Sequence, residues 1–328
     1  MKGRARVDVH AHVYPHAFLD LLEDTGQLSR RGDKIVVKES NHPNATEQEI
    51  HQGMWDKNLR IKVMDRLGTR MQVVSVGTPW LNYIPRTRSK EAARIVNSAI
   101  AEEVRGSPLR LAGLGVLAVN SPVDGIEEID YALDELGLKG FIVSTNIGGK
   151  PVFDTKFSKL LDHCARRNVV LFIHPVAFPD SRVYYRAAMT SIHFPAQTST
   201  AAFGLLKSGF FHRNPHAKVL LSHVGGLLPF ILGRLSRDAE TYFGDRKLRD
   251  DVSNLAELFY IDTLSYYTPA LDYALKEWGP KKVMFGTDYP FAWGDNWVRV
   301  VQVVDNTDTT QKQRALIFSE NALRLFKL

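Results

Sequence analysis

Short apolar runs recur along the chain, and most of them precede a segment whose apolar residues are three and four positions apart. A short apolar run bounded by turn residues is typical of a buried strand, whereas the spacing of three and four indicates one face of a helix. The runs predict strands at 7–12, 71–76, 111–116, 139–143, 169–173, 217–222, 258–261 and 282–285. The helical spacing predicts helices at 56–67, 89–105, 121–136, 157–167, 198–208, 226–241, 269–278 and 311–326.

The alternation of strand and helix patterns favours one fold. Eight strand–helix units in a chain of 328 residues are typical of a (β/α)8, or TIM, barrel. The competing α/β architecture, a doubly wound sheet, usually has a glycine-rich turn after its first strand. Here the first strand ends in His-Ala-His at 10–12, without the G-x-G-x-x-G pattern of a dinucleotide site. We therefore expect an α/β fold of the TIM-barrel type, which forms a single domain over residues 1–328.

Residues 13 to about 58 interrupt the alternation and form a small N-terminal insert after the first strand. This stretch looks irregular, with scattered charges and turn residues such as Gly26 and Pro43. Within it, Lys34–Lys38 fits a strand of a small hairpin. A long segment without strong periodicity is usually either functional or disordered. The sequence leaves open whether the insert acts as a lid.

Composition and charge narrow the classes of protein. The chain is 44% hydrophobic and 24% charged, with 42 basic and 36 acidic residues that give a formal net charge of +6. This mild, interleaved charge does not suggest a nucleic-acid partner. We find no secretory segment and no apolar run of about 18 residues, so neither export nor membrane spanning is expected. The single cysteine, Cys164, excludes a disulfide within the chain, fits a cytoplasmic location and reads as a packing residue.

Candidate chemistry gathers at the ends of four predicted strands. His10 and His12 are two apart in the first strand, so both imidazoles point to the same face. His174 follows the fifth strand, His223 the sixth and Asp288 the eighth. In a (β/α)8 barrel these positions share the C-terminal rim, where active sites are built. The sequence therefore predicts that five potential ligands face a common centre.

Each of these residues also has a structural explanation when it is taken alone. His174 could be a hydrogen-bonded core histidine, His223 could cap the next helix, and Asp288 could form an Asx turn before a proline. Together they favour a site for one metal ion, for which imidazoles and a carboxylate suit Zn²⁺ but also Mn²⁺, Fe²⁺ or Ni²⁺. A second metal bridged by a carboxylated lysine would need a lysine at the end of strand four. That strand ends in Phe-Ile-Val-Ser at 141–144, and Lys150 lies too far along the loop.

The same residues resemble the amidohydrolase superfamily, and further motifs resemble its aminocarboxymuconate-semialdehyde decarboxylase family. The motifs run in order across nearly the whole chain. They are Trp55-Asp56, Arg60-Ile61, Met64-Asp65, Gly113-Leu114-Gly115, Phe172-Ile173-His174-Pro175, Ser222-His223-Val224-Gly225-Gly226, Gly233-Arg234-Leu235-Ser236 and Gly286-Thr287-Asp288-Tyr289-Pro290-Phe291.

The resemblance implies a divalent ion, Zn²⁺ first and Mn²⁺ second, held by His10, His12, His174 and Asp288. It gives His223 and Asp288 catalytic roles, with His223 as a base or hydrogen-bond partner. The activity it implies is a metal-dependent decarboxylase, a carbon–carbon lyase, that acts on an unsaturated or aromatic carboxylic acid. The alternative is a hydrolase or hydratase of the same superfamily that uses a metal-bound hydroxide. A non-enzymatic binding protein on the same barrel is a further alternative, which the full set of metal-centre residues disfavours.

The resemblance also implies contacts to the substrate and a partner chain. Arg234 matches an arginine that reaches the neighbouring subunit's site to bind a substrate carboxylate, which implies a homodimer. Lys38 stands where the family's second carboxylate-binding arginine is expected, and the tryptophan usual after strand five is replaced by the stretch 190–194. These departures favour a different, aromatic acid. Candidate apolar walls for it are Trp80, Tyr83, Phe178 and Trp293.

Overall fold

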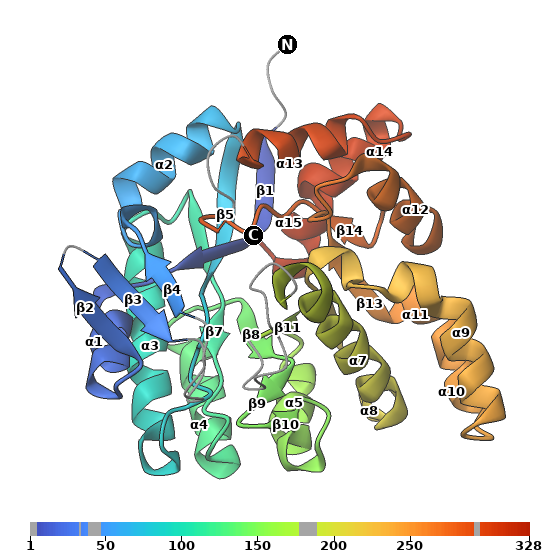
Figure 1. The fold of residues 1–328 in the computed structure, drawn as a ribbon, viewed down its shortest axis with the longest axis horizontal. Helices are drawn as coiled ribbons and strands as arrows, with labels where there is room; N and C mark the ends of the chain where they lie inside the picture. The colour runs from blue at the N-terminus through green and yellow to red at the C-terminus, as the bar shows by residue number, and fades with distance from the viewer. Residues whose placement is uncertain (1–4, 33, 39–46, 177–188, 292–295) are drawn as a thin grey trace.

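The strands of the molecule form a parallel barrel with helices around it (Figure 1). The structure is a computed structural model that describes residues 5–32, 34–38, 47–176, 189–291 and 296–328. The barrel strands are β1 (Arg6–Val13), β5 (Thr69–Val76), β6 (Leu111–Gly113) with β7 (Gly115–Val116), β8 (Gly140–Ser144), β11 (Val170–His174), β12 (Lys218–Leu221), β13 (Phe259–Asp262) and β14 (Val283–Met284). The eight predicted strands are thereby confirmed, the third of them divided in two.

Backbone hydrogen bonds join these strands in chain order. One sheet has the order β1-β5-β6 and the other β14-β13-β12-β11-β8-β7, with parallel pairing throughout. Leu114 links the sheets, because its N–H donates to the carbonyl oxygen of Val74 at 2.8 Å. At the other seam, the Val9 N–H donates to the Phe285 carbonyl at 2.9 Å, and Ala11 pairs with Tyr289. The ring of strands is therefore continuous, and β1 lies beside the chain that follows β14.

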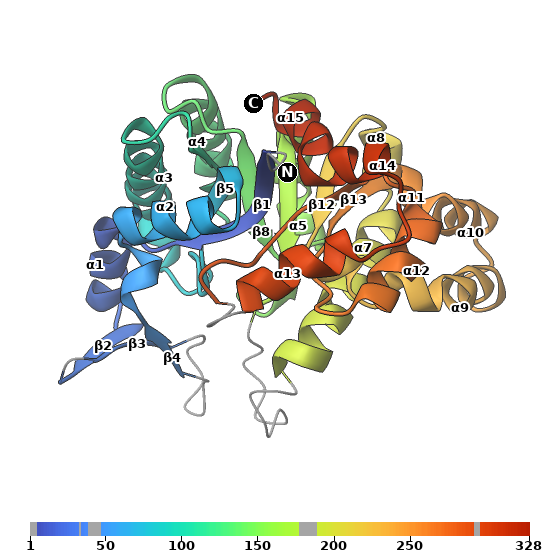
Figure 2. The same ribbon diagram turned by 90° about the horizontal axis from the view of Figure 1, so that it is seen from above.

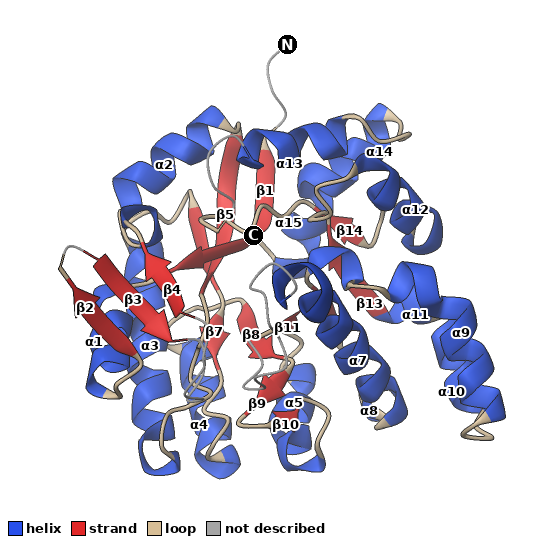
Figure 3. Ribbon diagram, in the orientation of Figure 1, coloured by secondary structure: helices blue, strands red, loops and turns tan. Residues whose placement is uncertain are grey.

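Helices follow the strands and cover the outside of the barrel (Figures 2 and 3). They are α2 (Lys57–Arg66), α3 (Ser89–Arg105), α4 (Pro122–Asp134), α5 (Thr155–Arg166), α7 (Phe194–Lys207), α8 (Phe210–Arg213), α9 (Leu228–Thr241), α10 (Arg246–Ser253), α11 (Leu255–Leu258), α12 (Thr268–Trp278), α13 (Asn296–Asp305), α14 (Gln311–Ala315) and α15 (Asn321–Phe326). The sequence did not predict α10 or α13. The first has few apolar positions, and the second is rich in valine, a residue with low helix propensity.

The insert after β1 is more regular than expected. It contains α1 (His16–Asp24) and a three-stranded antiparallel sheet of β2 (Leu28–Arg31), β3 (Lys34–Lys38) and β4 (Glu47–Ile50), with β3 in the middle. The expected strand at Lys34–Lys38 is confirmed, but the irregular reading of its neighbours was wrong. Charge pairs such as Arg31–Glu47 and Lys34–Glu49 join these strands, so hydrophobic periodicity did not reveal them. Residues 33 and 39–46 lie outside the described part.

Aromatic and aliphatic side chains fill the interior. Phe141, Phe172, Phe259 and Phe285 are fully buried, and so is Cys164 on α5. Burial raises the pKa of the Cys164 thiol far above its usual range, which agrees with a packing role. Within the described residues, no helix has both the length and the apolar character needed to cross a membrane.

Candidate metal centre

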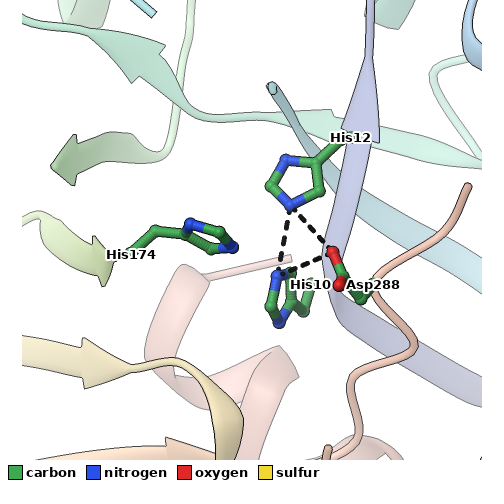
Figure 4. A group of neighbouring side chains, drawn as sticks. All are labelled: His10, His12, His174 and Asp288. Carbon is green, nitrogen blue, oxygen red and sulfur yellow. Dashed lines mark hydrogen bonds and ion pairs between the residues drawn. The ribbon is translucent and has the colours of Figure 1, made fainter. Parts of the chain in front are cut away.

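Four predicted ligands meet at one end of the barrel (Figure 4). His10 and His12 come from β1, His174 from the end of β11, and Asp288 from the segment after β14. One ligand atom of each residue lies within 4.8 Å of the others, and the three histidines are buried. The strand ends that sequence periodicity placed on a common rim therefore bring these side chains together.

A buried carboxylate that the sequence did not single out orients His10. Asp262, at the end of β13, accepts a hydrogen bond from His10 Nδ1 at 2.7 Å, and backbone N–H groups of His223, Val224 and Leu264 also donate to it. Burial opposes ionisation of Asp262, but its hydrogen bond to His10 and the histidine charges outweigh burial and lower its pKa. Because Nδ1 carries the proton, Nε2 of neutral His10 presents a lone pair to the centre.

The other two imidazoles are oriented by neighbouring groups. His174 Nδ1 lies 2.7 Å from the Pro175 carbonyl oxygen, which can only accept, so Nδ1 is protonated and Nε2 is not. His12 Nδ1 lies 3.2 Å from Ser75 Oγ. Burial lowers the pKa of both imidazoles, His174 the more strongly, and this favours the neutral, ligating form.

The cluster has the polarity of a cation site. His10 Nε2 lies 3.2 Å from His12 Nε2, and Asp288 Oδ1 lies 3.3 and 3.2 Å from these two nitrogens. Asp288 Oδ1 and His174 Nε2 are both buried and neither makes a well-aligned hydrogen bond. Lone pairs and a carboxylate at this spacing repel one another unless a cation or a proton lies between them. The chemistry of this donor set fits Zn²⁺ or Mn²⁺, with His10, His12, His174 and Asp288 as the residues that would hold it.

His223 lies beside this cluster. Its Nε2 is 4.0 Å from Asp288 Oδ2, and its buried Nδ1 has no hydrogen-bond partner within the described chain. The backbone at His223 and Val224 is left-handed, and the two N–H bonds to Asp262 hold that turn. The turn packs closely on α7, since a Cβ on Gly226 would lie 2.2 Å from the Pro195 carbonyl oxygen. His223, which taken alone could cap a helix, thus lies beside the cluster, with its ring centroid 5.3 Å from that of His10 and 5.2 Å from that of His174.

A cavity of about 740 Å³ opens over the cluster. His174, His223 and Asp288 lie in its wall, with Phe194, Phe230, Phe291, Leu227 and Leu264 as apolar lining and Gln48, Thr78, Ser265 and Tyr266 as polar lining. Gln48 and its neighbour Glu49 belong to β4, so the insert forms part of this wall. No arginine or lysine occurs in the described lining of the cavity.

The remaining predicted contacts lie elsewhere in this chain. Lys38 on β3 and Arg234 on α9 are exposed, and neither lines the cavity. Trp80 is buried, with its ring centroid 5.3 Å from that of His174, and Tyr83 is half-buried. Phe178 and Trp293 lie outside the described residues.

Two kinds of site residue escaped the sequence analysis. Asp262 directly follows the weak seventh predicted strand, 258–261, so the rule that identified His174 and Asp288 could have found it too. Gln48 and Tyr266 carry no such signal, because they lie in polar segments that only the fold brings to the cavity.

Comparison with known proteins identifies relatives along the whole chain. The amidohydrolase family profile matches residues 7–328. The 2-amino-3-carboxymuconate-6-semialdehyde decarboxylase of Dictyostelium discoideum is 28% identical over 88% of this chain and 83% of its own length. The 6-methylsalicylic acid decarboxylase of Aspergillus aculeatus is 29% identical over 98% and 96%.

Solved structures share the fold. The 5-carboxyvanillate decarboxylase of Sphingomonas paucimobilis superposes with a TM-score of 0.84 at 23% identity, covering 99% of this chain and 100% of that one. The dihydroxybenzoic acid decarboxylase of Polaromonas sp. JS666, solved with manganese and an inhibitor, has a TM-score of 0.81 at 25% identity and covers 99% and 98%. The TIM-barrel architecture and the resemblance read from the motifs are both confirmed, and the chain belongs to the amidohydrolase family.

Proposed function

We propose that this protein is a metal-dependent decarboxylase of an aromatic carboxylic acid. The observation that carries the proposal is the cluster of His10, His12, His174 and Asp288 at the wall of a cavity large enough for a small aromatic acid. The four proteins named above are decarboxylases, and the names of three of them state an aromatic acid as the substrate. A hydrolase or hydratase would use the same ligands, but the curated relatives named above are decarboxylases.

The metal in this proposal is a single divalent ion. The resemblance favours Zn²⁺, and the manganese bound in the Polaromonas enzyme supports Mn²⁺ equally. When bound, such an ion acts as a Lewis acid that polarises a substrate oxygen and draws the anionic acid into the cavity. The described lining contains no lysine or arginine that could attract the anionic acid in place of the metal.

The side chains around the centre supply the proton that the reaction needs. Decarboxylation breaks the bond between the ring carbon and the carboxylate carbon, CO₂ departs, and the ring carbon gains one proton. His223 can deliver that proton, because its ring lines the cavity beside Asp288. Asp288 contacts His10 and His12 through Oδ1, and its Oδ2 lies 4.0 Å from His223 Nε2, so its carboxylate can stabilise the protonated imidazole of His223.

The cavity wall supports an aromatic substrate. Phe194 and Phe291 flank the ligand histidines, with ring centroids 6.5 Å from His174 and 5.3 Å from His12 respectively. Aromatic rings pack favourably at such distances, so they can hold the substrate ring. Gln48 and Tyr266 add neutral polar groups that suit a hydroxyl substituent.

Metal uptake is expected to release about one proton per ion at pH 7. Burial alone would lower the pKa of His10, but the carboxylates of Asp288 and Asp262 outweigh it and raise that pKa to about 10 in the metal-free protein. Because the pKa of His10 is higher in the folded state, its protonation stabilises the metal-free fold. This contribution is complete below about pH 6.5 and is lost as the pH rises toward 10. Metal must displace this proton, so affinity should rise with pH, by about tenfold per unit.

Isothermal titration of the metal-free protein with Mn²⁺, in buffers of different ionisation enthalpy, measures the released proton directly. The same titrations at pH 7, 8 and 9 give the slope of affinity against pH. No proton release together with a flat affinity over this range would contradict the protonation state assigned to His10.

We further propose a homodimer in the cytoplasm whose sites are completed by Arg234 of the second subunit. Leu227, Phe230 and Tyr273 leave an apolar patch exposed on α9 and α12, and Phe230 stacks on Tyr273 at 5.0 Å between centroids. Arg234 follows Phe230 by four residues, so both lie on one face of α9. Leu227 and Phe230 also line the cavity, which puts this patch next to the site. We also propose Lys38 as a second contact to the substrate carboxylate.

Mixing two inactive variants tests the shared site. Arg234→Ala and His174→Ala should each have little activity alone, whereas the re-equilibrated mixture should recover about a quarter of wild-type turnover. Half of its dimers are mixed, and each of these has one complete site. Sedimentation of each variant shows whether dimers persist. Active Arg234→Ala protein, or an inactive mixture of intact dimers, would contradict a shared site.

A panel of acids tests the proposed reaction. Enzyme loaded with Mn²⁺ or Zn²⁺ should release CO₂ from at least one hydroxylated benzoic acid, and metal-free enzyme should release none. Turnover of amides or lactones without CO₂ release would instead establish the hydrolase.

A further inference from the structure

Arg60 on α2 is a buried cation that the proposed reaction does not use. It is 2% exposed, and its Nη2 donates to the carbonyl oxygen of His12 at 2.5 Å, while Nη1 donates to Gln72 Oε1 at 3.1 Å. Its guanidinium carbon lies 4.7 Å from the ring centroid of Tyr289. Removing a guanidinium from water is costly, and this one donates to an amide and a carbonyl oxygen rather than to a carboxylate in the described structure. Its position calls for an explanation other than stability.

Gln72 connects this cation to a buried anion. Its Nε2 donates to Asp8 Oδ2 at 2.9 Å, and Asp8 is fully buried. Asp8 also accepts hydrogen bonds from the backbone N–H of His10 at 3.1 Å and from the backbone N–H and hydroxyl of Thr287 at 3.0 and 2.6 Å. Arg60, Gln72, Asp8 and Thr287, hereafter the seam network, therefore tie α2 and β5 to both sides of the seam between β1 and the chain after β14.

The seam carries three of the four ligands of the metal centre. The Asp288 N–H donates to the His10 carbonyl at 2.8 Å, and the His12 N–H donates to the Tyr289 carbonyl at 2.6 Å. The backbone of His10 and His12 therefore bonds both to the seam network, through Asp8 and Arg60, and to residues 288 and 289 across the seam. A slip of one strand against the other would move Asp288 relative to both histidines.

We propose that Arg60 is a positioning residue for the metal centre. Through Gln72, Asp8 and the His12 carbonyl, it fixes the register between β1 and residues 287–289, and so sets the relative positions of His10, His12 and Asp288. The inference rests on the metal site of the proposed function but is independent of the reaction catalysed there. Groups that orient metal ligands typically contribute 10–100-fold in metal affinity.

A second arginine provides a matched control. Arg94 on α3 donates to Glu128 Oε2 at 2.8 Å, and its guanidinium carbon lies 3.4 Å from the ring centroid of Tyr131. Asn97 also contacts Glu128, as Gln72 contacts Asp8. The same four types of group are therefore present, but on the outer helices α3 and α4 rather than on the seam.

The test compares Arg60→Met with Arg94→Met. Each metal-free protein is titrated with Mn²⁺ while electron paramagnetic resonance measures the free ion, and the visible spectrum of the Co²⁺ form reports ligand geometry. We expect Arg60→Met to bind Mn²⁺ about 10–100-fold more weakly and to show a changed Co²⁺ spectrum. Arg94→Met should lose thermal stability but keep the wild-type affinity and spectrum. Circular dichroism establishes that both variants are folded.

Two further variants keep the inference testable if Arg60→Met does not fold. Gln72→Leu should reproduce the weaker binding, and Arg60→Lys should restore part of it, because lysine keeps the charge but not the second hydrogen bond. Wild-type Mn²⁺ affinity and Co²⁺ spectrum in a folded seam variant, or an equal loss in Arg94→Met, would overturn the inference alone. A wild-type protein that takes up none of Mn²⁺, Co²⁺ or Zn²⁺ would overturn the metal site and the inference with it.

Discussion

Asp288→Asn is expected to lower kcat by about 10²–10⁴-fold while the barrel stays folded. The carboxylate lies 3.2–3.3 Å from Nε2 of His10 and His12 and 4.0 Å from Nε2 of His223. Asp288 is therefore placed both to bind the metal and to stabilise His223 when that imidazole carries the proton. Burial opposes its ionisation, but the neighbouring histidines outweigh this and hold its pKa well below the usual range. Asparagine keeps the size and removes both the charge and the capacity to stabilise a protonated imidazole.

The measurement is steady-state turnover of an acid found in the panel, together with metal content and the thermal midpoint. Asp134→Asn is the matched control, because Asp134 makes an exposed ion pair with Arg167 on the outer helices and should leave kcat unchanged. Residual turnover above about a tenth of the wild-type value in metal-replete Asp288→Asn would remove this carboxylate from the mechanism.

Removal of the metal should abolish turnover and lower the thermal midpoint by several degrees. His174 Nε2 and Asp288 Oδ1 are buried without well-aligned hydrogen bonds, so without a cation these groups lose stabilising partners. A ligand that binds only the folded state stabilises it by about 2.7 kcal/mol at a free concentration of 100 Kd. The experiment is dialysis against a strong chelator, followed by calorimetry and a turnover assay.

Adding back different ions distinguishes the site from a general salt effect. Mn²⁺ or Zn²⁺ should restore both turnover and the thermal midpoint, whereas Mg²⁺ should restore neither, because it prefers oxygen ligands and this site offers three imidazoles. Full turnover in a chelated protein that elemental analysis shows to be free of divalent ions would contradict a metal-dependent reaction.

The barrel and the cluster of candidate metal ligands were predictable because both depend on local patterns. Buried parallel strands are short apolar runs, and the polar residues that follow them, such as His174 and Asp288, must share one rim once the strands form a barrel. The three-stranded sheet of the insert was not predictable in this way. Its outer strands β2 and β4 each contain a single apolar residue, Leu28 and Ile50, and charge pairs join the sheet, so these two strands resemble loop sequence.

The supporting residues could not be read from the sequence because their partners are far away along the chain. Asp8 and Thr287 are 279 positions apart, and Arg60 meets the His12 carbonyl from a different element. Nothing local distinguishes Arg60 from an exposed helical arginine, or Gln48 from any polar strand residue. Only the closure of the barrel and the placement of the insert give these side chains their surroundings.

Decarboxylation itself is tested most directly by following isotopes from solvent. The metal-loaded enzyme is incubated with 2,6-dihydroxybenzoate or 6-methylsalicylate in D₂O and, separately, in H₂¹⁸O, and the products are analysed by mass spectrometry. We expect one CO₂ for each acid consumed and a phenolic product with one deuterium at the carbon that lost its carboxylate. A product that contains ¹⁸O from water and forms without CO₂ would show hydrolysis or hydration, and would contradict decarboxylation.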